Sequence, residues 1–329
     1  MSLNICCRGG EKGMRKLKKY QSTIVQWLGL ILVVLIFGIW SEGNLFSRYN
    51  INTMLETVTP LLVVCVGMAF IFAHGGMDIS SGAVIAAASL AAVQLMNRTD
   101  SLVLGIMAAM AISVVCYVIN VIVTNKFGLM ATITSLAIMF SARGLVTYIC
   151  QLMPNESISI SNVSVELFKK NHVFMVVVMV LTVLILGVIF NYTEIGKGAK
   201  AIGDNELAAE QNGIPVNRTK IICYVIAGIC VGLASVFKLS AVGMVQSTTG
   251  NGMEMDVLVV VVLGGMALSG GAGTRMSSAV VGAFTYVILI KGLTIIGMNP
   301  NVVLLVKAII FLVIIFVTAP RSRMKTMPK

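Results

Sequence analysis

Apolar runs alternate with short polar intervals along the whole chain. Ten runs stand out, at approximately 23–40, 55–73, 79–96, 102–123, 129–150, 173–190, 220–240, 255–268, 276–297 and 301–319. Most of them approach the ~20 apolar residues that a helix needs to cross a bilayer. The run at 255–268 is the weakest, because it is short and begins beside Glu254 and Asp256. The pattern predicts an all-α, polytopic integral membrane protein with about ten transmembrane helices.

Composition supports this fold class. Hydrophobic residues make up 57% of the chain and charged residues 11%, whereas soluble domains carry roughly 25% charged residues. No A-x-A-like cleavage site follows the run at 23–40, so we interpret it as the first span and not as a signal peptide. We therefore expect a cytoplasmic tail at 1–22, a membrane domain at 23–319 and a second cytoplasmic tail at 320–329.

The basic residues predict the orientation in the membrane. The net charge is +11, and most Lys and Arg residues lie in alternate intervals, which include both termini and 191–220. This bias indicates that these intervals are cytoplasmic. Topology thus explains the positive charge, and we expect no nucleic-acid partner. Four basic residues lie within apolar runs, where they either snorkel or line a pathway: Arg143, Lys238, Lys291 and Lys307.

Nothing in the sequence indicates catalysis or a bound metal. The seven cysteines lack metal-ligand spacing. The two histidines, His74 and His172, are about a hundred residues apart. A phosphate loop of the form G-x-x-x-x-G-K-[S/T] is absent from the sequence. We therefore expect no cofactor, no metal and no enzymatic activity in this chain.

The longest polar interval, Asn191–Lys220, predicts a short helix. Asp204 and Asn205 can cap it, and Gly213 ends it shortly before Pro215. The helix carries small residues on one face and, between two spans, would have no core of its own to pack into. We therefore expect it to press against another protein through the set Asp204, Asn205, Glu206, Ala208, Ala209 and Gly213.

Two glycine-rich blocks share the pattern G-G-M-x-[I/L]-S-x-G, at 75–82 and 264–271. Chance similarity and an internal duplication are both open explanations. Glycine pairs let backbones approach closely or let a helix break where protein surrounds it. We expect Asp78 to cap the following helix or to line an aqueous cavity. The candidate helix-break or gating residues are Gly75, Gly76, Asp78, Gly82, Gly264, Gly265, Gly270 and Gly271.

Two predicted outside loops carry candidate contacts. The loop at 151–172 is the largest and is a candidate docking surface for an external protein. The loop at 242–254 is uncharged until its end, so its polar residues could face a neutral polar solute. Its candidate pathway residues are Gln246, Thr248 and Asn251.

Several ordered blocks resemble a known family. His74–Gly82 looks like a T-G-G-I-D-L-S-V-G block, Gly203–Val216 like G-G-N-x-E-A-A-x-x-x-G-I, and Val260–Gly273 like V-L-G-G-x-S-L-S-G-G-x-G. Together, over about 45–319, they resemble the membrane permease subunits of bacterial ABC importers for monosaccharides, of the ribose, xylose and galactoside type. Two positions depart from the pattern: Leu207 stands where Glu is usual, and His74 where Thr is usual.

The resemblance implies a permease of the bacterial inner membrane that works as a homodimer or heterodimer. A separate cytoplasmic ATPase would receive the coupling helix at 205–213, and an extracytoplasmic solute-binding protein would deliver a sugar or similar neutral solute for import. An ion-coupled secondary transporter is the first alternative, and a membrane scaffold that only recruits a partner is the second. The identity of the sugar stays open.

Overall fold

The computed structural model describes residues 26–153, 155–161 and 163–318. The predicted tails at 1–22 and 320–329 lie outside these ranges. After a first helix at Gln26–Trp40, the elements are η1 (Asn44–Phe46), α2 (Arg48–Ala73), α3 (Ser81–Thr99), α4 (Leu102–Phe127), α5 (Ala131–Gln151), β1 (Ser157–Ser159), α6 (Glu166–Lys169), α7 (His172–Tyr192), α8 (Glu194–Asp204), α9 (Glu206–Gln211), α10 (Val216–Val242), β2 (Met244–Gln246), α11 (Met253–Leu263), α12 (Met276–Ile295) and α13 (Pro300–Thr318).

Each of the ten apolar runs coincides with a helix, but ten spans are not confirmed. Among the described residues, six helices are long and apolar enough to cross a membrane: α2, α4, α5, α7, α10 and α12. The run at 255–268 is only partly helical, because α11 ends at Leu263. Its 11 residues rise about 16 Å, whereas the hydrocarbon core is about 30 Å thick. By itself α11 therefore cannot span the bilayer.

Helix α2 is the centre of the molecule. Every residue from Val58 to Ala73 is buried, and α2 packs against α10, α12, α7 and α8. By contrast, only about a quarter of the apolar window of α4, α5 or α7 is buried, so these helices present most of their apolar surface outward. This is the distribution expected when lipid is the outer solvent.

Helix α10 crosses α4 closely because it carries two glycines one turn apart. A Cβ atom at Gly228 would come within 2.9 Å of the Cα atom of Val114, and one at Gly232 within 2.7 Å of the Cα atom of Met110. Such small-x-x-x-small spacing lets two membrane helices approach backbone to backbone. The α4–α10 pair is one of the most extensive contacts in the fold.

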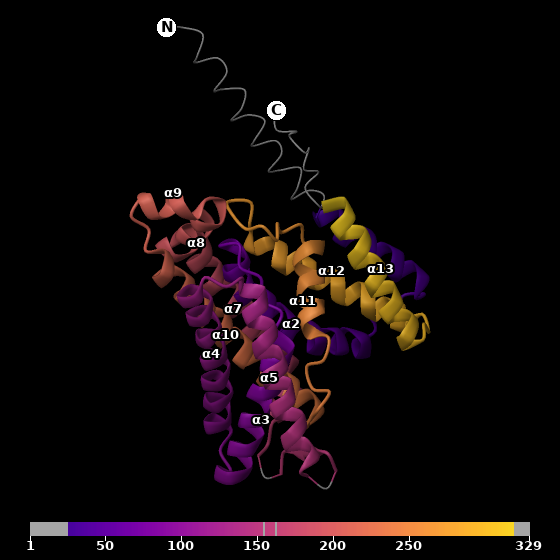
Figure 1. The fold of residues 1–329 in the computed structure, drawn as a ribbon. Helices are drawn as coiled ribbons and strands as arrows, with labels where there is room; N and C mark the ends of the chain where they lie inside the picture. The colour runs from indigo at the N-terminus through magenta and orange to yellow at the C-terminus, as the bar shows by residue number, and fades with distance from the viewer. Residues whose placement is uncertain (1–25, 154, 162, 319–329) are drawn as a thin grey trace.

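The loops gather at two ends of the bundle, as the alternating topology predicted. At one end, β1 pairs antiparallel with β2, with Ile158 opposite Val245, and thus joins the predicted outside loops at 151–172 and 242–254. At the other end, the predicted inside segments around 74, 204 and 272 contact one another. Figure 1 shows α8 and α9 together at this second end. Which end faces the cytoplasm stays a prediction.

Candidate functional site

The predicted short helix is present as α9. The side chain of Asn205 accepts a hydrogen bond from the Ala208 N–H at 3.1 Å, which confirms it as the N-cap. Gly213 has a φ of 80° and lies beyond the last helical turn, as expected for a residue that ends a helix. Pro215 directly precedes α10, which begins at Val216.

The expectation that α9 has no core of its own is wrong. Ala209 is buried against Ile202 of α8 and Val216 of α10. Its methyl group therefore fixes α9 to this chain and does not lie on the face open to a partner. The outward face instead carries Leu207, which is 71% exposed and is the most prominent apolar side chain of α9. Sequence reasoning treated Leu207 only as a departure from the family pattern.

Helix α8 was not predicted, although the sequence carried a signal for it. Ile195, Ala199 and Ile202 follow the i, i+4, i+7 spacing of an amphipathic helix. Glycines and charged residues between them gave this stretch the appearance of a loop. Helix α8 carries α9 at its end and packs against α2, α7 and α10.

Asp204 does not cap α9. Its Oδ1 atom accepts a hydrogen bond from the Ala272 N–H at 3.0 Å, and thereby connects α8 to the loop that follows α11. In the same loop, the Gly271 N–H donates to the Ala73 carbonyl at the end of α2 at 2.9 Å. Three segments far apart in sequence thus meet at this end. We call this contact, formed by Ala73, Gly203, Asp204, Gly271 and Ala272, the α8 junction.

The two glycine-rich blocks end their helices in the same way. After α2, the N–H groups of Gly75 and Gly76 donate to carbonyls three and five residues earlier, and after α11 Gly265 and Met266 do the same. This match is offset by one residue from the sequence alignment. The second block also reaches the first, since Gly270 lies against the backbone of Phe72, Ala73 and Gly75. The internal duplication stays a prediction.

The remaining glycine candidates mark close backbone contacts. A Cβ atom at Gly264 would overlap the carbonyl of Ser278 in α12, and one at Gly82 would overlap Gly250 and Glu254. Gly82 thus holds the start of α3 against the start of α11, away from the α8 junction. A gating role for these residues stays a prediction.

Asp78 lies in the non-helical segment between α2 and α3 and is buried. Its carboxylate accepts hydrogen bonds from the Ser80 N–H at 2.8 Å and the Asn120 side chain at 2.7 Å, and contacts the Tyr117 hydroxyl at 3.4 Å. The first of these bonds reaches the N–H of Ser80, which is itself the N-cap residue of α3, and among the described residues no side chain caps the first turn of that helix. The capping role of Asp78 stays a prediction. Tyr117 and Asn120 were missed, although polar residues three apart in an apolar run share one helix face and indicate an inward contact.

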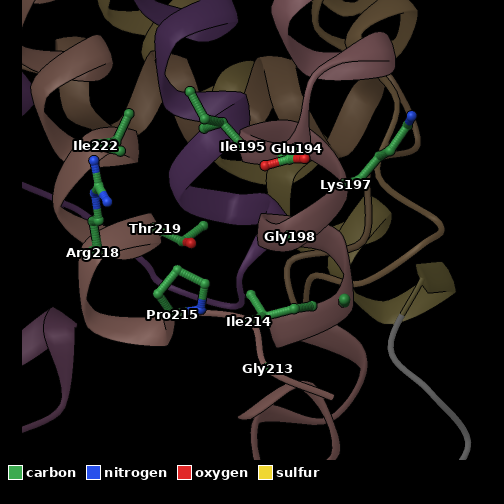
Figure 2. A pocket seen from close by; sticks show the side chains of 11 residues that line it. Glu194, Ile195, Lys197, Gly198, Gly213, Ile214, Pro215, Arg218, Thr219 and Ile222 are labelled. Carbon is green, nitrogen blue, oxygen red and sulfur yellow. The ribbon is translucent and has the colours of Figure 1, made fainter.

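A groove runs between α8 and the start of α10, beside α9. It has a volume of about 650 Å³ and includes Gly213 in its lining. Figure 2 shows Ile214 and Pro215 between the two helices, with Lys197 and Arg218 on opposite sides. The groove and the exposed Leu207 together make the α9 end uneven and partly apolar.

The three candidate pathway residues come together at the opposite end. Gln246, Thr248 and Asn251 line a cavity of about 280 Å³ with Lys238 and Asp256. The polar loop therefore does not project freely from the bundle. It folds over a hollow whose walls carry both uncharged and charged groups.

Three of the charged residues within apolar runs gather beside this hollow. Lys238, Lys291 and Lys307 line an adjoining cavity of about 70 Å³ with Asp256. Lys307 donates to Asp256 at 2.7 Å, and the Tyr286 hydroxyl donates to the same oxygen. Asp256 therefore offsets part of the positive charge. Their role in a pathway stays a prediction.

Arg143 is the fourth basic residue within an apolar run, and it is bonded to the loop at 242–254, which carries the candidate pathway residues. Its Nη1 atom donates to the carbonyl of Thr249 at 2.6 Å and contacts that of Ser247 at 3.4 Å.

We expect Arg143→Met to speed amide hydrogen exchange in residues 246–251 about tenfold or more, because a hydrogen bond to a charged group contributes about 1.5–3 kcal/mol. Arg98→Met, an exposed arginine at the same end, is the control. Equal exchange in both variants would refute the anchoring role.

The predicted docking loop at 151–172 forms a charged hollow at this end. Arg48, Glu166, Lys170 and His172 line it, and its volume is about 580 Å³. A hydrogen bond from Lys170, together with the charge of that lysine, lowers the pKa of Glu166. The hollow thus presents fixed charges of both signs to a protein that approaches from this side.

Comparison with known proteins identifies the family. Residues 50–317 match the family of permease components of branched-chain amino acid transport systems. The chain belongs to this family. This permease is also similar to the ribose import permease RbsC of Bacillus subtilis, with 32% identity over 90% of this chain and 92% of that protein.

The names of other similar relatives refer to different sugars. The L-arabinose permease AraH of Escherichia coli is 32% identical over 82% of each chain. The fructose import permease FruF of Bifidobacterium longum is 27% identical over 94% of this permease and 92% of its own length. No solved structure gives a significant match. This permease is thus a multi-pass membrane protein whose relatives are transport subunits and not enzymes.

Proposed function

We propose that this permease imports a monosaccharide or a similar small neutral solute into the bacterial cytoplasm as the membrane subunit of an ABC importer. A separate ATPase binds the α9 end, and a solute-binding protein docks at the β1–β2 end. A second permease subunit, identical or related, completes the complex. The main support for a sugar as the substrate is the similarity to sugar permeases over nearly the whole length of the chain.

The α8 junction supports the coupling role. Glu206 at the start of α9 forms an ion pair with Lys220 of α10 at 2.7 Å, and Asp204 at the end of α8 holds the loop after α11. A partner that shifts α9 therefore pulls on α10, on that loop and, through Gly271, on the end of α2. Packed helices of this kind switch between discrete arrangements, so a small shift can reach the whole bundle.

Uptake by a reconstituted complex tests the proposal. Liposomes would contain this permease and its ATPase, with ATP inside and the solute-binding protein outside. Radiolabelled ribose, arabinose and fructose are the probes, and leucine represents the amino acids in the family description. We expect ATP-dependent sugar uptake. Uptake driven by an ion gradient without the ATPase would establish the secondary-transporter alternative, and the absence of flux under any energy source would favour a scaffold.

The exposed face of α9 gives a separate test of the docking site. We expect Leu207→Asp to abolish co-purification of the ATPase and to lower uptake at least tenfold, because it places a charge on an apolar contact surface. Thermal stability should not change, since Leu207 is exposed in this chain.

Leu152→Asp is the matched control for co-purification of the ATPase; uptake is not compared, because Leu152 lies in the loop where the solute-binding protein is proposed to dock. Leu152 is a similarly exposed leucine that caps α5 at the opposite end of the bundle. Retained co-purification with Leu207→Asp would show that the ATPase binds elsewhere.

A further inference from the structure

A second polar cavity lies at the α9 end, apart from the pathway cavity beside Gln246. Its volume is about 180 Å³. That is the share of liquid volume of about six water molecules, and well below the 300–1,000 Å³ of drug-sized ligand pockets. The cavity therefore suits one small solute. Its walls come from the end of α2, from α4 and the α4–α5 turn, and from α9 and α10.

Three residues that line this cavity each carry a buried polar atom with no hydrogen-bond partner among the described residues. These atoms are Nε2 of His74, Nδ2 of Asn125 and the hydroxyl of Tyr224. His74 is 9% exposed and Tyr224 is 1% exposed. Leaving such a group unpaired is unfavourable, because the buried atom has lost its hydrogen bonds to water without gaining a replacement. Three unpaired groups around one hollow therefore indicate that a polar molecule occupies it for part of the transport cycle.

The chemistry of the lining selects the class of that molecule. A phenol hydroxyl can donate and accept, an imidazole nitrogen donates or accepts according to its tautomer, and the amide nitrogen donates. Sugar hydroxyl groups match all three. The ionic groups of the cavity, Glu206 and Lys220, are paired with each other, so the lining offers no unpaired charge to a carboxylate or an ammonium group.

We take the side of the cavity at this ion pair as its mouth, because Glu206 extends from the lining into solvent. The side chain of Glu206 is 54% exposed, whereas that of Lys220 is 16% exposed. Glu206 is the first residue of α9 and Lys220 lies in the first turns of α10. Displacement of α9 would separate the two side chains and widen the mouth.

We propose that the cavity lined by His74, Asn125 and Tyr224 is an exit-side binding site for one neutral polyhydroxylated solute, which the Glu206–Lys220 pair closes. This inference rests on the proposed function. It adds a second binding site to a translocation pathway that begins at Gln246, Thr248 and Asn251. It also favours a neutral sugar over a branched-chain amino acid, because the paired lining offers no free charge to balance the carboxylate and ammonium groups of an amino acid.

Protection of an introduced cysteine tests the site in the complete complex. Thr124→Cys is made at a half-buried lining position that is not one of the three proposed contacts. The chain also carries Cys6→Ser and Cys7→Ser, and the other five cysteines are buried or half-buried. The complex is labelled with a maleimide from the α9 side, with increasing ribose, arabinose, fructose or leucine. We expect the transported sugar to slow labelling, and leucine to have no effect. The parent chain without Thr124→Cys gives the background.

A second substitution in the same chain ties protection to the lining. Tyr224→Phe removes only the unpartnered hydroxyl and should raise the half-protecting sugar concentration roughly three- to tenfold, the equivalent of one hydrogen bond. Tyr148→Phe, which alters an exposed tyrosine of α5, should leave it unchanged.

Different results would refute the exit-side binding site and the proposed function. If ATP drives uptake of a sugar but that sugar does not slow labelling of the Thr124→Cys variant, or Tyr224→Phe leaves protection unchanged, the exit site is refuted and the proposed function stands. Protection by leucine alone would overturn the substrate class. If ATP drives uptake of none of the sugars, the proposed function fails and the exit site falls with it.

Discussion

Replacement of Asp78 by leucine is expected to lower the free energy of unfolding by about 3 kcal/mol or more. The variant removes the acceptor for the Ser80 N–H, the Asn120 amide and the Tyr117 hydroxyl. All four residues are buried, so water cannot replace the lost partner. A buried donor left unpaired costs about 1–3 kcal/mol, and three donors are affected. Thermal unfolding of the purified complex in detergent should show a melting temperature several degrees lower.

Two further variants make the result specific. Asp78→Asn keeps the volume and one acceptor oxygen, so its destabilisation should lie between those of the native chain and Asp78→Leu. Asp100→Asn is the control, because Asp100 is an exposed carboxylate at the other end of α3, in a left-handed conformation that asparagine tolerates. A melting temperature of Asp78→Leu equal to that of Asp100→Asn would contradict the proposed network.

The apolar runs predicted the helices well because burial in protein and exposure to lipid both select the same residue types. It could not predict which helices cross the membrane alone. The apolar composition of 255–268 predicted a membrane span. Helix α11 instead ends early, at Gly264 and Gly265, and Gly264 lies close to the backbone of α12. The contact that requires a glycine at position 264 is with Ser278, in the next helix along the chain. Hydropathy is a property of the segment itself and cannot report that contact.

The coupling segment was predictable where its structure is local. Asn205 caps α9 through a bond that spans three residues, and a pattern of residue types contains this information. Asp204 stands next to Asn205 and looks equally suited to a cap, but its partner is the Ala272 N–H in a distant loop. Ala209 likewise turned inward because Ile202 and Val216 offer it an apolar contact.

The candidate pathway residues were predicted from the absence of charge in their loop, and this reasoning was incomplete. Gln246, Thr248 and Asn251 do line one cavity, but Lys238 and Asp256 complete it from α10 and α11. The helices bring these charges to the loop. The cavity of His74, Asn125 and Tyr224 was invisible in the sequence for the same reason, since its residues come from α2, α4 and α10.

The α8 junction gives the second large expected effect. Gly203→Ala should lower ATP-driven uptake tenfold or more while the ATPase still co-purifies and still hydrolyses ATP. A Cβ atom at Gly203 would overlap the Ala73 carbonyl and the Gly271 N–H, which are hydrogen-bonded to each other. Because both are backbone groups, α8 must move away from α2 and from the loop after α11. The exposed face around Leu207 would still bind the ATPase, but its motion would no longer reach the bundle.

Gly198→Ala is the matched control, in the same helix and with the same added methyl group. Its nearest neighbours would be the side chains of Ile214 and Thr219 at 3.5 Å, an ordinary van der Waals distance. Alanine favours a helix over glycine by about 1 kcal/mol, so both variants should keep α8 helical and the comparison isolates the steric overlap. Wild-type uptake with Gly203→Ala would show that the junction does not transmit motion. Loss of uptake with Gly198→Ala as well would locate the sensitivity in α8 itself and not in its contact with α2.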